Sequence, residues 1–239
     1  MIKNKKKRLV IIPARGGSKR ITKKNIKIFN GEPIISYALN AASVCNIFDT
    51  IHVSTESSEI YEICKRRGYE PHFMRPKKLA NDYVGIMQVL KFVVEKFESE
   101  GATFDTVCMM YATSPMVDYR DLISACDIFE KSDGESALLS VCQYPTPIEK
   151  AWVIDKEGKL VPNNPKAFKI RTQDLKLSFY DAGMFCFYTA KYIKGSQDFG
   201  NPFSFRPFKI PYYRVTDIDD SEDWKRAELM FKAFNGSEL

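Results

Sequence analysis

Short apolar runs alternate with helix-like segments as far as residue 142, and this alternation constrains the fold more than any other feature. Five runs are predicted to be strands: residues 9–12, 50–54, 70–74, 106–112 and 137–142. Helical patterns are predicted at residues 34–42, with Pro33 in the first turn, and at 59–67, 84–98 and 118–131. Because the apolar residues of the strands are continuous rather than alternating, the strands should be buried on both faces. The order predicts a mainly parallel sheet with helices on both sides, a three-layer α/β/α, Rossmann-like fold.

The pattern changes after residue 142. Between residues 143 and 180 the chain has several prolines, a turn at 155–158 and many aromatic residues, which predicts short strands and long loops. We expect this insertion to cover the site or to contact another subunit. Apolar strands at 178–188 and 206–211 and an amphipathic helix at 221–234 follow. The expected organisation is a basic tail at residues 1–8 and a single domain at 9–239 that contains the insertion.

Composition and charge argue against several classes of protein. Lysine and arginine outnumber aspartate and glutamate by 36 to 30, a net charge of +6, but five of the positive charges lie in residues 3–8. A solvated basic arm, without a basic stripe in the body of the chain, argues against nucleic-acid binding. No apolar run approaches the roughly 20 residues that span a bilayer, and the apolar stretch after the tail is too short for a signal peptide. We therefore expect no membrane insertion and a cytoplasmic location.

Cysteines and histidines form no motif for metal binding or nucleophilic catalysis. The six cysteines are scattered without a C-x-x-C pair, and there are only two histidines. The thiols are typical of small buried side chains, and a zinc site is not expected. No Ser-His-Asp or Cys-His arrangement is apparent, so nucleophilic catalysis by a side chain is not expected.

The loop after the first strand combines glycines with cations. Its candidate ligand-binding residues are Ala14, Arg15, Gly16, Gly17, Ser18, Lys19, Lys24 and Asn25. Glycines let backbone amides approach phosphate oxygens closely, and the cations supply countercharge. The spacing matches neither G-x-x-x-x-G-K-[ST] nor G-x-G-x-x-G, and an ordinary basic turn is the alternative. Parallel sheets bind ligands at the carboxyl ends of their strands, where the loops at 54–58, 75–82 and 113–118 should join this one.

Two carboxylates near the C-terminus form a candidate metal site. Asp217 and Asp219 flank Ile218 just before the last predicted helix. In an extended backbone both carboxylates point to one side while Ile218 points into the core. Paired hard oxygen ligands beside a phosphate suit Mg²⁺. The alternative is that this segment, with Asp220 and Ser221, only caps the helix.

Further polar residues follow other predicted strands. Arg75 and Asp82 follow the third strand, where Arg75 could bind a phosphate or a carboxylate, and Thr113 and Ser114 offer hydroxyl groups after the fourth. The alternatives are a surface arginine before a turn and a proline turn that starts a helix. Asp181 interrupts an apolar strand, which is costly unless the carboxylate is paired or meets a ligand.

Taken together, these segments resemble the CMP-sialic acid synthetase (acylneuraminate cytidylyltransferase) family, and most of all its pseudaminic acid branch. The motifs that carry the resemblance are, in chain order, Ala14-Arg15-Gly16-Gly17-Ser18-Lys19 with Lys24-Asn25, Met74-Arg75-Pro76 with Leu79-Ala80-Asn81-Asp82, Tyr111-Ala112-Thr113-Ser114-Pro115, and Asp217-Ile218-Asp219 with Glu222-Asp223-Trp224 and Ala227-Glu228. One such motif is moderately specific, whereas four in the same order form a strong signal.

The resemblance implies a nucleotide-diphospho-sugar transferase fold, with the insertion as a dimerisation subdomain, and a homodimer. It implies CTP as co-substrate, Mg²⁺, and transfer of CMP to the anomeric hydroxyl of a nonulosonic acid for cell-surface or flagellar glycan synthesis. By motif, Arg15, Lys19, Asp217 and Asp219 would be catalytic, the aspartates by holding the metal. The eight loop residues named above would bind CTP together with Arg75 and Asp82. Candidates for the sugar site are Tyr111, Thr113, Ser114, Lys150, Arg171, Gln173, Tyr180 and Asp181.

Two departures from sialate-specific members bear on the sugar. Many of those members have Gln-Pro-Thr-Ser-Pro-Leu-Arg in place of residues 111–117, and Arg-Pro-Asn-Gly in place of residues 180–183. Residues 171–175 and 180–183 look like the pseudaminic acid branch, with Lys150 or Arg171 as candidates for binding the sugar carboxylate. The alternatives are N-acetylneuraminate, legionaminate and 3-deoxy-octulosonate as substrates. A more distant alternative is a non-catalytic nucleotide- or nucleic-acid-binding protein.

Overall fold

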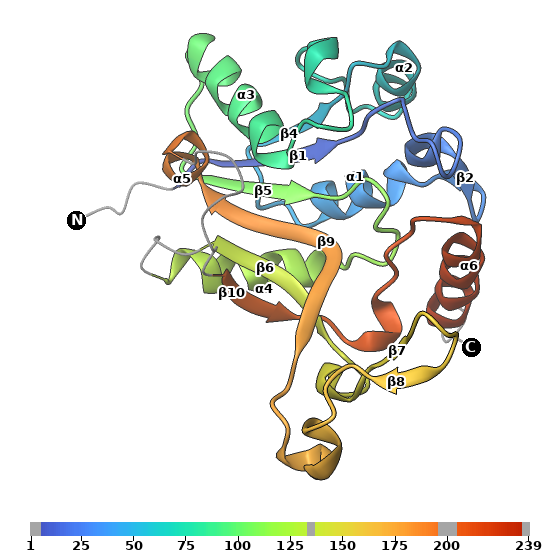
Figure 1. Ribbon diagram of the computed structural model, residues 1–239. Helices are drawn as coiled ribbons and strands as arrows, with labels where there is room; N and C mark the ends of the chain where they lie inside the picture. Colours follow the sequence, from blue (N-terminus) through green and yellow to red (C-terminus); the bar gives the residue numbers. More distant parts are fainter. Residues whose placement is uncertain (1–5, 133–136, 196–204, 236–239) are drawn as a thin grey trace.

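A six-stranded sheet lies at the centre of the computed structural model, which describes residues 6–132, 137–195 and 205–235 (Figure 1). The strands are β1 (Arg8–Pro13), β4 (Thr50–Ser54), β5 (Thr106–Met110), β6 (Ala137–Gln143), β9 (Phe179–Thr189) and β10 (Phe205–Lys209). Their order across the sheet is β10-β6-β9-β5-β1-β4. β1 pairs in parallel with β4 and β5, and β10 with β6, whereas β9 runs antiparallel between β5 and β6. The predicted mainly parallel, Rossmann-like α/β fold is confirmed.

Helices cover both faces of the sheet because alternate side chains of each strand point to opposite sides. Val10 and Ile12 of β1 pack into one core with α1 (Ile35–Val44), α2 (Ser58–Arg66) and α4 (Tyr119–Glu130). Leu9 and Ile11 pack into a second core with α3 (Ile86–Ser99) and α5 (Ala190–Gly195). All four side chains are fully buried. Each such burial contributes roughly 1.5–3 kcal/mol, so β1 is tied strongly to both layers.

A smaller cluster joins the C-terminal helix α6 (Ser221–Asn235) to the segment after the first loop. That segment contains η1 (Lys24–Ile26) and the small hairpin of β2 (Ile28–Phe29) and β3 (Glu32–Pro33). Phe29 lies edge-on to Tyr37 and Trp224, with ring centroids 5.7 and 5.4 Å apart. Ile218 is fully buried in the same cluster. These contacts hold residues 217–219 beside the first loop, although the two segments are far apart in the chain.

Two predicted elements are wrong. Residues 70–74 form no strand. Pro71 has no N–H to donate to a ladder, and the N–H of Arg75 bonds the carbonyl of Thr55 at 2.8 Å. Pro33 lies in β3 rather than in the first turn of α1. The other predicted strands and helices are confirmed, with ends that move by one or two residues.

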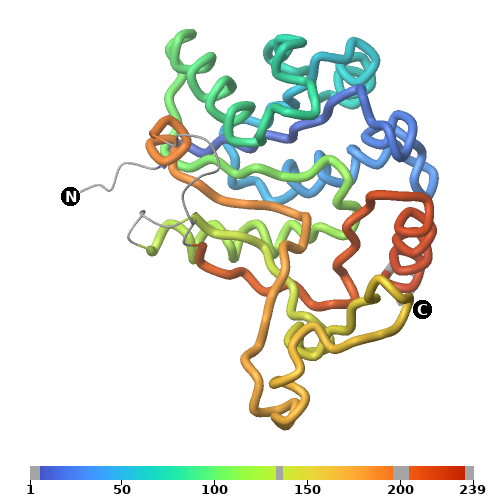
Figure 2. Tube along the Cα trace, in the orientation of Figure 1, coloured from blue at the N-terminus to red at the C-terminus, as the bar shows by residue number. Residues whose placement is uncertain are grey.

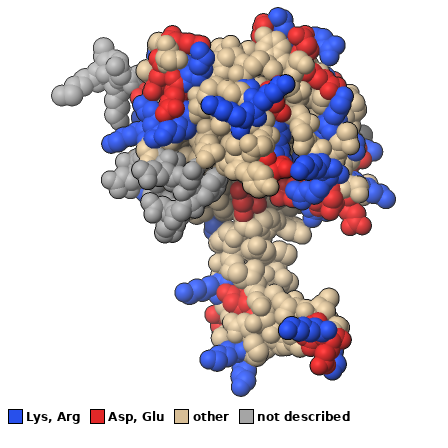
Figure 3. Space-filling view, turned by 45° about the horizontal axis from the view of Figure 1, so that its top comes forward, with Lys and Arg blue, Asp and Glu red and all other residues tan. Residues whose placement is uncertain are grey.

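The chain between β6 and β9 leaves the sheet and forms an arm, residues 144–178 (Figures 1 and 2). It contains η3 (Ile148–Lys150), the ribbon of β7 (Trp152–Ile154) and β8 (Leu160–Pro162), η4 (Ala167–Lys169) and η5 (Thr172–Asp174). The space-filling view shows a lobe that projects from the main body (Figure 3). Large apolar side chains are exposed on the ribbon, with Trp152 at 54%, Ile154 at 73% and Leu160 at 66%.

The N-terminal end of the described chain is tied to the domain. Residues 1–5 of the expected basic tail lie outside the described residues. Arg8 belongs to β1, where its Nε and Nη2 each donate to the Glu130 carboxylate at 2.9 Å. Within the described ranges, no helix is both long enough and apolar enough to cross a membrane.

His52 of β4 is a buried titratable group in this fold. Neither ring nitrogen has a hydrogen-bond partner among the described residues. The ring packs against Phe73, Phe97 and His72 at centroid distances of 4.3, 5.4 and 5.7 Å. Burial, with a smaller contribution from His72, lowers the pKa of His52 to about 3. The imidazole of an unfolded chain takes up a proton near pH 6.5. Between these values the unfolded state binds more protons, so the folded state loses stability as the pH falls.

We therefore expect His52 to lower the free energy of unfolding by up to about 1.4 kcal/mol per pH unit between about pH 6 and about pH 4. His52→Leu should remove this part of the pH dependence, measured from urea unfolding curves at several pH values. The control His72→Gln should keep most of it, because His52 stays buried. Equal slopes in the wild type and in His52→Leu would contradict this assignment.

Candidate active site

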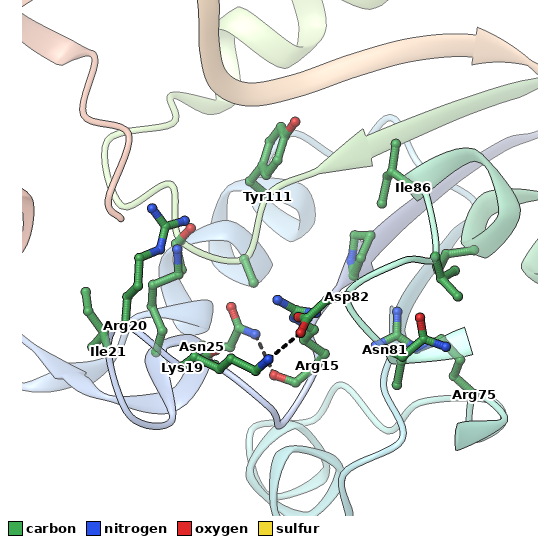
Figure 4. A pocket seen from close by; sticks show the side chains of 18 of the residues that line it. Arg15, Lys19, Arg20, Ile21, Asn25, Arg75, Asn81, Asp82, Ile86 and Tyr111 are labelled. Carbon is green, nitrogen blue, oxygen red and sulfur yellow. Dashed lines mark hydrogen bonds and ion pairs between the residues drawn. The ribbon is translucent and has the colours of Figure 1, made fainter. Parts of the chain in front are cut away.

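A cavity of about 380 Å³ opens beside the carboxyl ends of β1 and β5, at the edge where a ligand was expected. Its walls come from the loop after β1, the segment between α2 and α3, and the residues after β5 (Figure 4). Its polar lining includes Arg15, Ser18, Lys19, Arg20, Lys24, Asn25, Arg75, Asn81, Asp82, Tyr111, Thr113 and Asp219. Asp219, just before α6, belongs to a fourth segment, so four segments that lie far apart in the sequence meet at this cavity.

Backbone hydrogen bonds hold the first loop in place. Ala14 is buried, and its N–H donates to the carbonyl of Ser54 at 3.0 Å. The side-chain Nδ2 of Asn25 donates to the backbone carbonyl of Arg15 at 2.9 Å. Gly16 approaches the next loop so closely that an added Cβ would lie 3.1 Å from Cβ of Ser57. Gly17 has open space at that position, so only the first glycine is required by packing.

Two cations of the loop share one carboxylate across the cavity. Arg15 Nη1 lies 2.7 Å from Asp82 Oδ1, and Lys19 Nζ lies 2.6 Å from Asp82 Oδ2 (Figure 4). Lys19, and after it Arg15, hold the pKa of the Asp82 carboxyl below its usual range. The Lys19 side chain is 80% exposed. The carboxylate thus marks a position where another anion could meet both cations.

Two further carboxylates, those of Asp217 and Asp219, lie on either side of Ile218. Asp219 Oδ1 accepts from Arg20 Nη2 at 2.8 Å and lies 3.5 Å from Lys24 Nζ, which donates to the carbonyl of Ile218 at 2.5 Å. Ile218 is buried while Asp217 is exposed, as the extended pattern predicted. The N–H groups at the start of α6 bond instead to Asp220. Helix capping therefore does not account for Asp217 or Asp219.

Asp217 and Asp219 could together hold a divalent cation. Although Asp217 is accessible to solvent, partial desolvation by its surroundings, and then the neighbouring charge of Asp219, raise the pKa of its carboxyl. A cation between the two carboxylates would relieve that repulsion, and hard oxygen ligands suit Mg²⁺. No cluster of three or more candidate metal ligands occurs in the described part of the chain, so phosphate oxygens or water would complete the coordination.

β9 brings further polar groups to the same place. Asp181 Oδ1 accepts from the N–H of Gly183 at 2.8 Å, and its Oδ2 lies 3.5 Å from the hydroxyl of Tyr111. Ser114 Oγ donates to the carbonyl of Gly183 at 2.6 Å. An added Cβ on Gly183 would lie 3.7 Å from Asp217 Oδ1, so this turn abuts the Asp217 carboxylate. Asp181 itself does not line the cavity. Although it is accessible to solvent, partial desolvation by its surroundings, and then the charge of Asp217, raise its pKa.

Other candidate residues for the sugar lie elsewhere in this chain. Lys150, Arg171 and Gln173 belong to the arm and do not line the cavity. Lys150 Nζ lies 3.2 Å from Thr172 Oγ1, and Arg171 pairs with Asp174 at 2.8 Å. The ring of Tyr180 packs against Tyr144, with centroids 4.8 Å apart.

Two residues of the site were not predicted from the sequence. Arg20 lines the cavity and pairs with Asp219. Glu56 accepts from the N–H of Gly16 and from Arg75. Glu56 lies two residues after the end of β4, in the loop at the carboxyl end of a strand, which is the one signal that could have identified it. Arg20 belongs to the basic loop, but only the fold shows which anion it meets.

The shared carboxylate gives a direct prediction. Asp82 should compete with a bound polyanion for Arg15 and Lys19, so Asp82→Asn should bind inorganic tripolyphosphate roughly threefold more tightly at low ionic strength. The difference should shrink as salt is added. Isothermal titration calorimetry measures both effects. Asp127→Asn is the matched control, because Asp127 pairs with Lys131 on the surface of α4. Weaker binding by Asp82→Asn would show that the carboxylate supports the anion site rather than competing for it.

Comparisons with known proteins identify the family. The family described as Cytidylyltransferase matches residues 9–181. The chain is 34% identical over 230 residues to a pseudaminic acid cytidylyltransferase of Campylobacter jejuni, covering 95% of this chain and 97% of that protein. It is 31% identical to a CMP-N,N'-diacetyllegionaminic acid synthase of Legionella pneumophila, covering 71% and 69% of the two chains. The fold is similar to that of a CMP:2-keto-3-deoxy-manno-octonic acid synthetase solved in complex with CTP, with a TM-score of 0.71, 15% identity, and coverage of 98% and 100%. The chain therefore belongs to the cytidylyltransferase family.

Proposed function

We propose that this cytidylyltransferase transfers CMP from CTP to the anomeric hydroxyl of pseudaminic acid and releases pyrophosphate. One observation carries the proposal: a single cavity is lined by Arg15 and Lys19 and by Asp219, in a chain 34% identical over nearly its whole length to an enzyme of that name. Asp217 lies two residues before Asp219. The product would supply cell-surface or flagellar glycan synthesis. A flagellin modification protein of Campylobacter coli, 27% identical over 95% of this chain, supports that use.

The residues of the cavity can be given roles. Arg15 and Lys19 would bind the phosphates of CTP and neutralise the charge that grows on the leaving pyrophosphate. Asp217 and Asp219 would hold Mg²⁺, which when bound neutralises phosphate charge and makes the attacking hydroxyl more acidic. Arg20 and Lys24 would orient the Asp219 carboxylate.

The sugar would enter from the side of β9. Tyr111 and Asp181 lie beside Gly183 and Asp217, and we propose that they meet a hydroxyl or amide group of the sugar. Ser114 already donates to a backbone carbonyl, so its role would be to hold the turn rather than to bind the sugar.

Other nonulosonic acids are the alternative substrates. Relatives that act on legionaminate and N-acylneuraminate are 31% and 29% identical to this chain. A panel of pseudaminic, legionaminic, N-acetylneuraminic and 3-deoxy-octulosonic acids in a pyrophosphate-release assay with CTP and Mg²⁺ would distinguish them. We propose pseudaminic acid as the substrate with the highest kcat/KM.

The cysteines support the proposed cytoplasmic location. All six are free and buried. Cytosolic proteins keep thiols reduced, whereas secreted proteins tend to form disulfides.

The same assay tests the cavity. Lys19→Ala should lower kcat/KM roughly 100-fold, because it removes a cation from the developing charge of pyrophosphate. Asp219→Ala should abolish Mg²⁺-dependent release while the unfolding temperature stays close to that of the wild type. Lys23→Asn is the control within the same loop, because Lys23 pairs with Glu59 and its backbone has φ 53°, which asparagine tolerates. Unchanged kinetics in Lys19→Ala would refute the loop as the phosphate site.

We also propose that the arm packs against a second copy of the chain. Ile154 and Leu160 are register partners in the ribbon, and strand periodicity puts Trp152 on the same face. A two-stranded ribbon with so much exposed apolar surface is marginally stable alone. Lys150 and Arg171 stay on the arm within one chain, so their expected contact with the sugar would require that second copy.

If the protein is a dimer, light scattering after size-exclusion chromatography should give a mass of twice 27.5 kDa. Ile154→Lys with Leu160→Lys should give monomers, because two charges would be buried in the interface. Ile123→Lys changes a similarly apolar, exposed residue of α4 and should leave the dimer intact. A monomeric wild type would refute the proposal.

A further inference from the structure

The Glu56 carboxylate connects the loop after β1 to Arg75. Its Oε1 accepts from the N–H of Gly16 at 2.8 Å, and its Oε2 accepts from Arg75 Nη2 at 2.8 Å. The side chains are 14% exposed for Glu56 and 4% for Arg75. One partly buried carboxylate therefore contacts the loop after β1 with one oxygen and the buried Arg75 with the other.

We propose that Glu56 is a positioning residue that couples the phosphate loop to Arg75, so that CTP meets both walls in a fixed relative geometry. This inference rests on the proposed function. Glu56 does not line the cavity, and so it acts through its two partners, of which Arg75 does line it.

The charge state of Glu56 suits this role. Burial by itself would raise the pKa of the carboxyl, but the hydrogen bonds from Arg75 and Gly16 outweigh burial and hold the pKa below its usual range. Glu56 is therefore ionised at neutral pH. A buried, hydrogen-bonded ion pair is costly to break from one side, because the remaining charge is left unpaired.

Both partners are held closely enough for one carboxylate to set their positions. Gly16 packs tightly against its neighbours, since an added Cβ would lie 3.1 Å from Cβ of Ser57 and 3.5 Å from Glu56 Oε1. The N–H of Arg75 bonds the carbonyl of Thr55, next to Glu56 in the chain. Arg75 Nε is buried and has no hydrogen-bond partner among the described residues. It is a donor that a ligand in the cavity could satisfy.

The exposed ion pairs of the cavity differ from this one. Lys19 with Asp82 and Arg20 with Asp219 are solvent-accessible, and pairs of that kind exchange partners at little cost. The Glu56–Arg75 pair is much less accessible to water than these exposed pairs, so it should persist when CTP binds. It would hold the loop after β1 and Arg75 in place while the exposed pairs exchange their partners.

A double-mutant cycle tests the coupling. The dissociation constant of CTP is measured by calorimetry for the wild type, Glu56→Gln, Arg75→Gln and the double variant. Each single change should weaken binding at least tenfold, and the double variant should bind about as weakly as the weaker single variant, because both changes break the same unit. In steady-state kinetics of Glu56→Gln, the KM for CTP should rise by a larger factor than kcat falls. Multiplicative effects of the two changes would overturn the proposal.

Glu56→Asp covers the case in which Glu56→Gln does not fold. It keeps the negative charge, but it is one methylene shorter and cannot hold both 2.8 Å contacts. It should weaken CTP binding about fivefold or more at an unchanged unfolding temperature, and wild-type affinity would overturn the proposal. Glu59→Gln is the matched control, because Glu59 pairs with Lys23 at the surface and should not affect binding.

Pyrophosphate release by the wild type, measured in the same preparation, separates this inference from the proposed function. If the wild type releases pyrophosphate and the Glu56 variants bind CTP normally, only the positioning role is refuted. If the wild type neither binds CTP nor releases pyrophosphate, both proposals are refuted.

Discussion

Burial of β1 on both faces is the constraint on which the rest of the structure depends. Its apolar residues have no exposed surface, and the strand is hydrogen-bonded to β4 on one side and to β5 on the other. The carboxyl end of β1, where the first loop begins, is therefore fixed by packing on both faces and by a neighbouring strand on each side. The bond from Ala14 to Ser54 extends that support into the loop. Cations carried by such a loop can be held in place without burying their charges, which helps to orient a ligand.

The ion pairs in and around the cavity fall into two classes that differ in their exposure to solvent. Arg15, Lys19 and Arg20 face carboxylates that remain open to water, so these contacts can yield to a ligand anion at small cost. In the pair of Glu56 and Arg75 the arginine is buried and the glutamate is largely shielded, so loss of the glutamate would leave the arginine charge unpaired away from solvent. The same types of charged group thus serve as exchangeable contacts or as framework, and burial decides which.

The antiparallel strand β9 is the other determinant of the site. Its pairing with β6 shifts register between Leu139 and Val141, close to where Asp181 and Gly183 turn toward Tyr111 and Asp217. Asp181, one of the residues proposed to meet the sugar, therefore comes from a strand that follows the arm directly. This arrangement links the arm to the cavity through a single continuous segment.

The sequence alone determined the strand and helix order, because continuous apolar runs and helical periodicity reflect burial that every residue of a segment shares. It also determined the loop cations and the carboxylates on either side of Ile218, since an extended backbone requires their alternation. Local patterns could not exclude a strand at 70–74, because hydrogen-bond partners outside the segment decided that question. Only the tertiary structure decided that Glu56 joins Gly16 to Arg75, that Arg20 meets Asp219, and that Lys150 and Arg171 lie away from the cavity of their own chain. These contacts depend on distances between segments far apart in the chain. The type of a single residue does not show how far it lies from such a segment, so these contacts could not be predicted from local sequence.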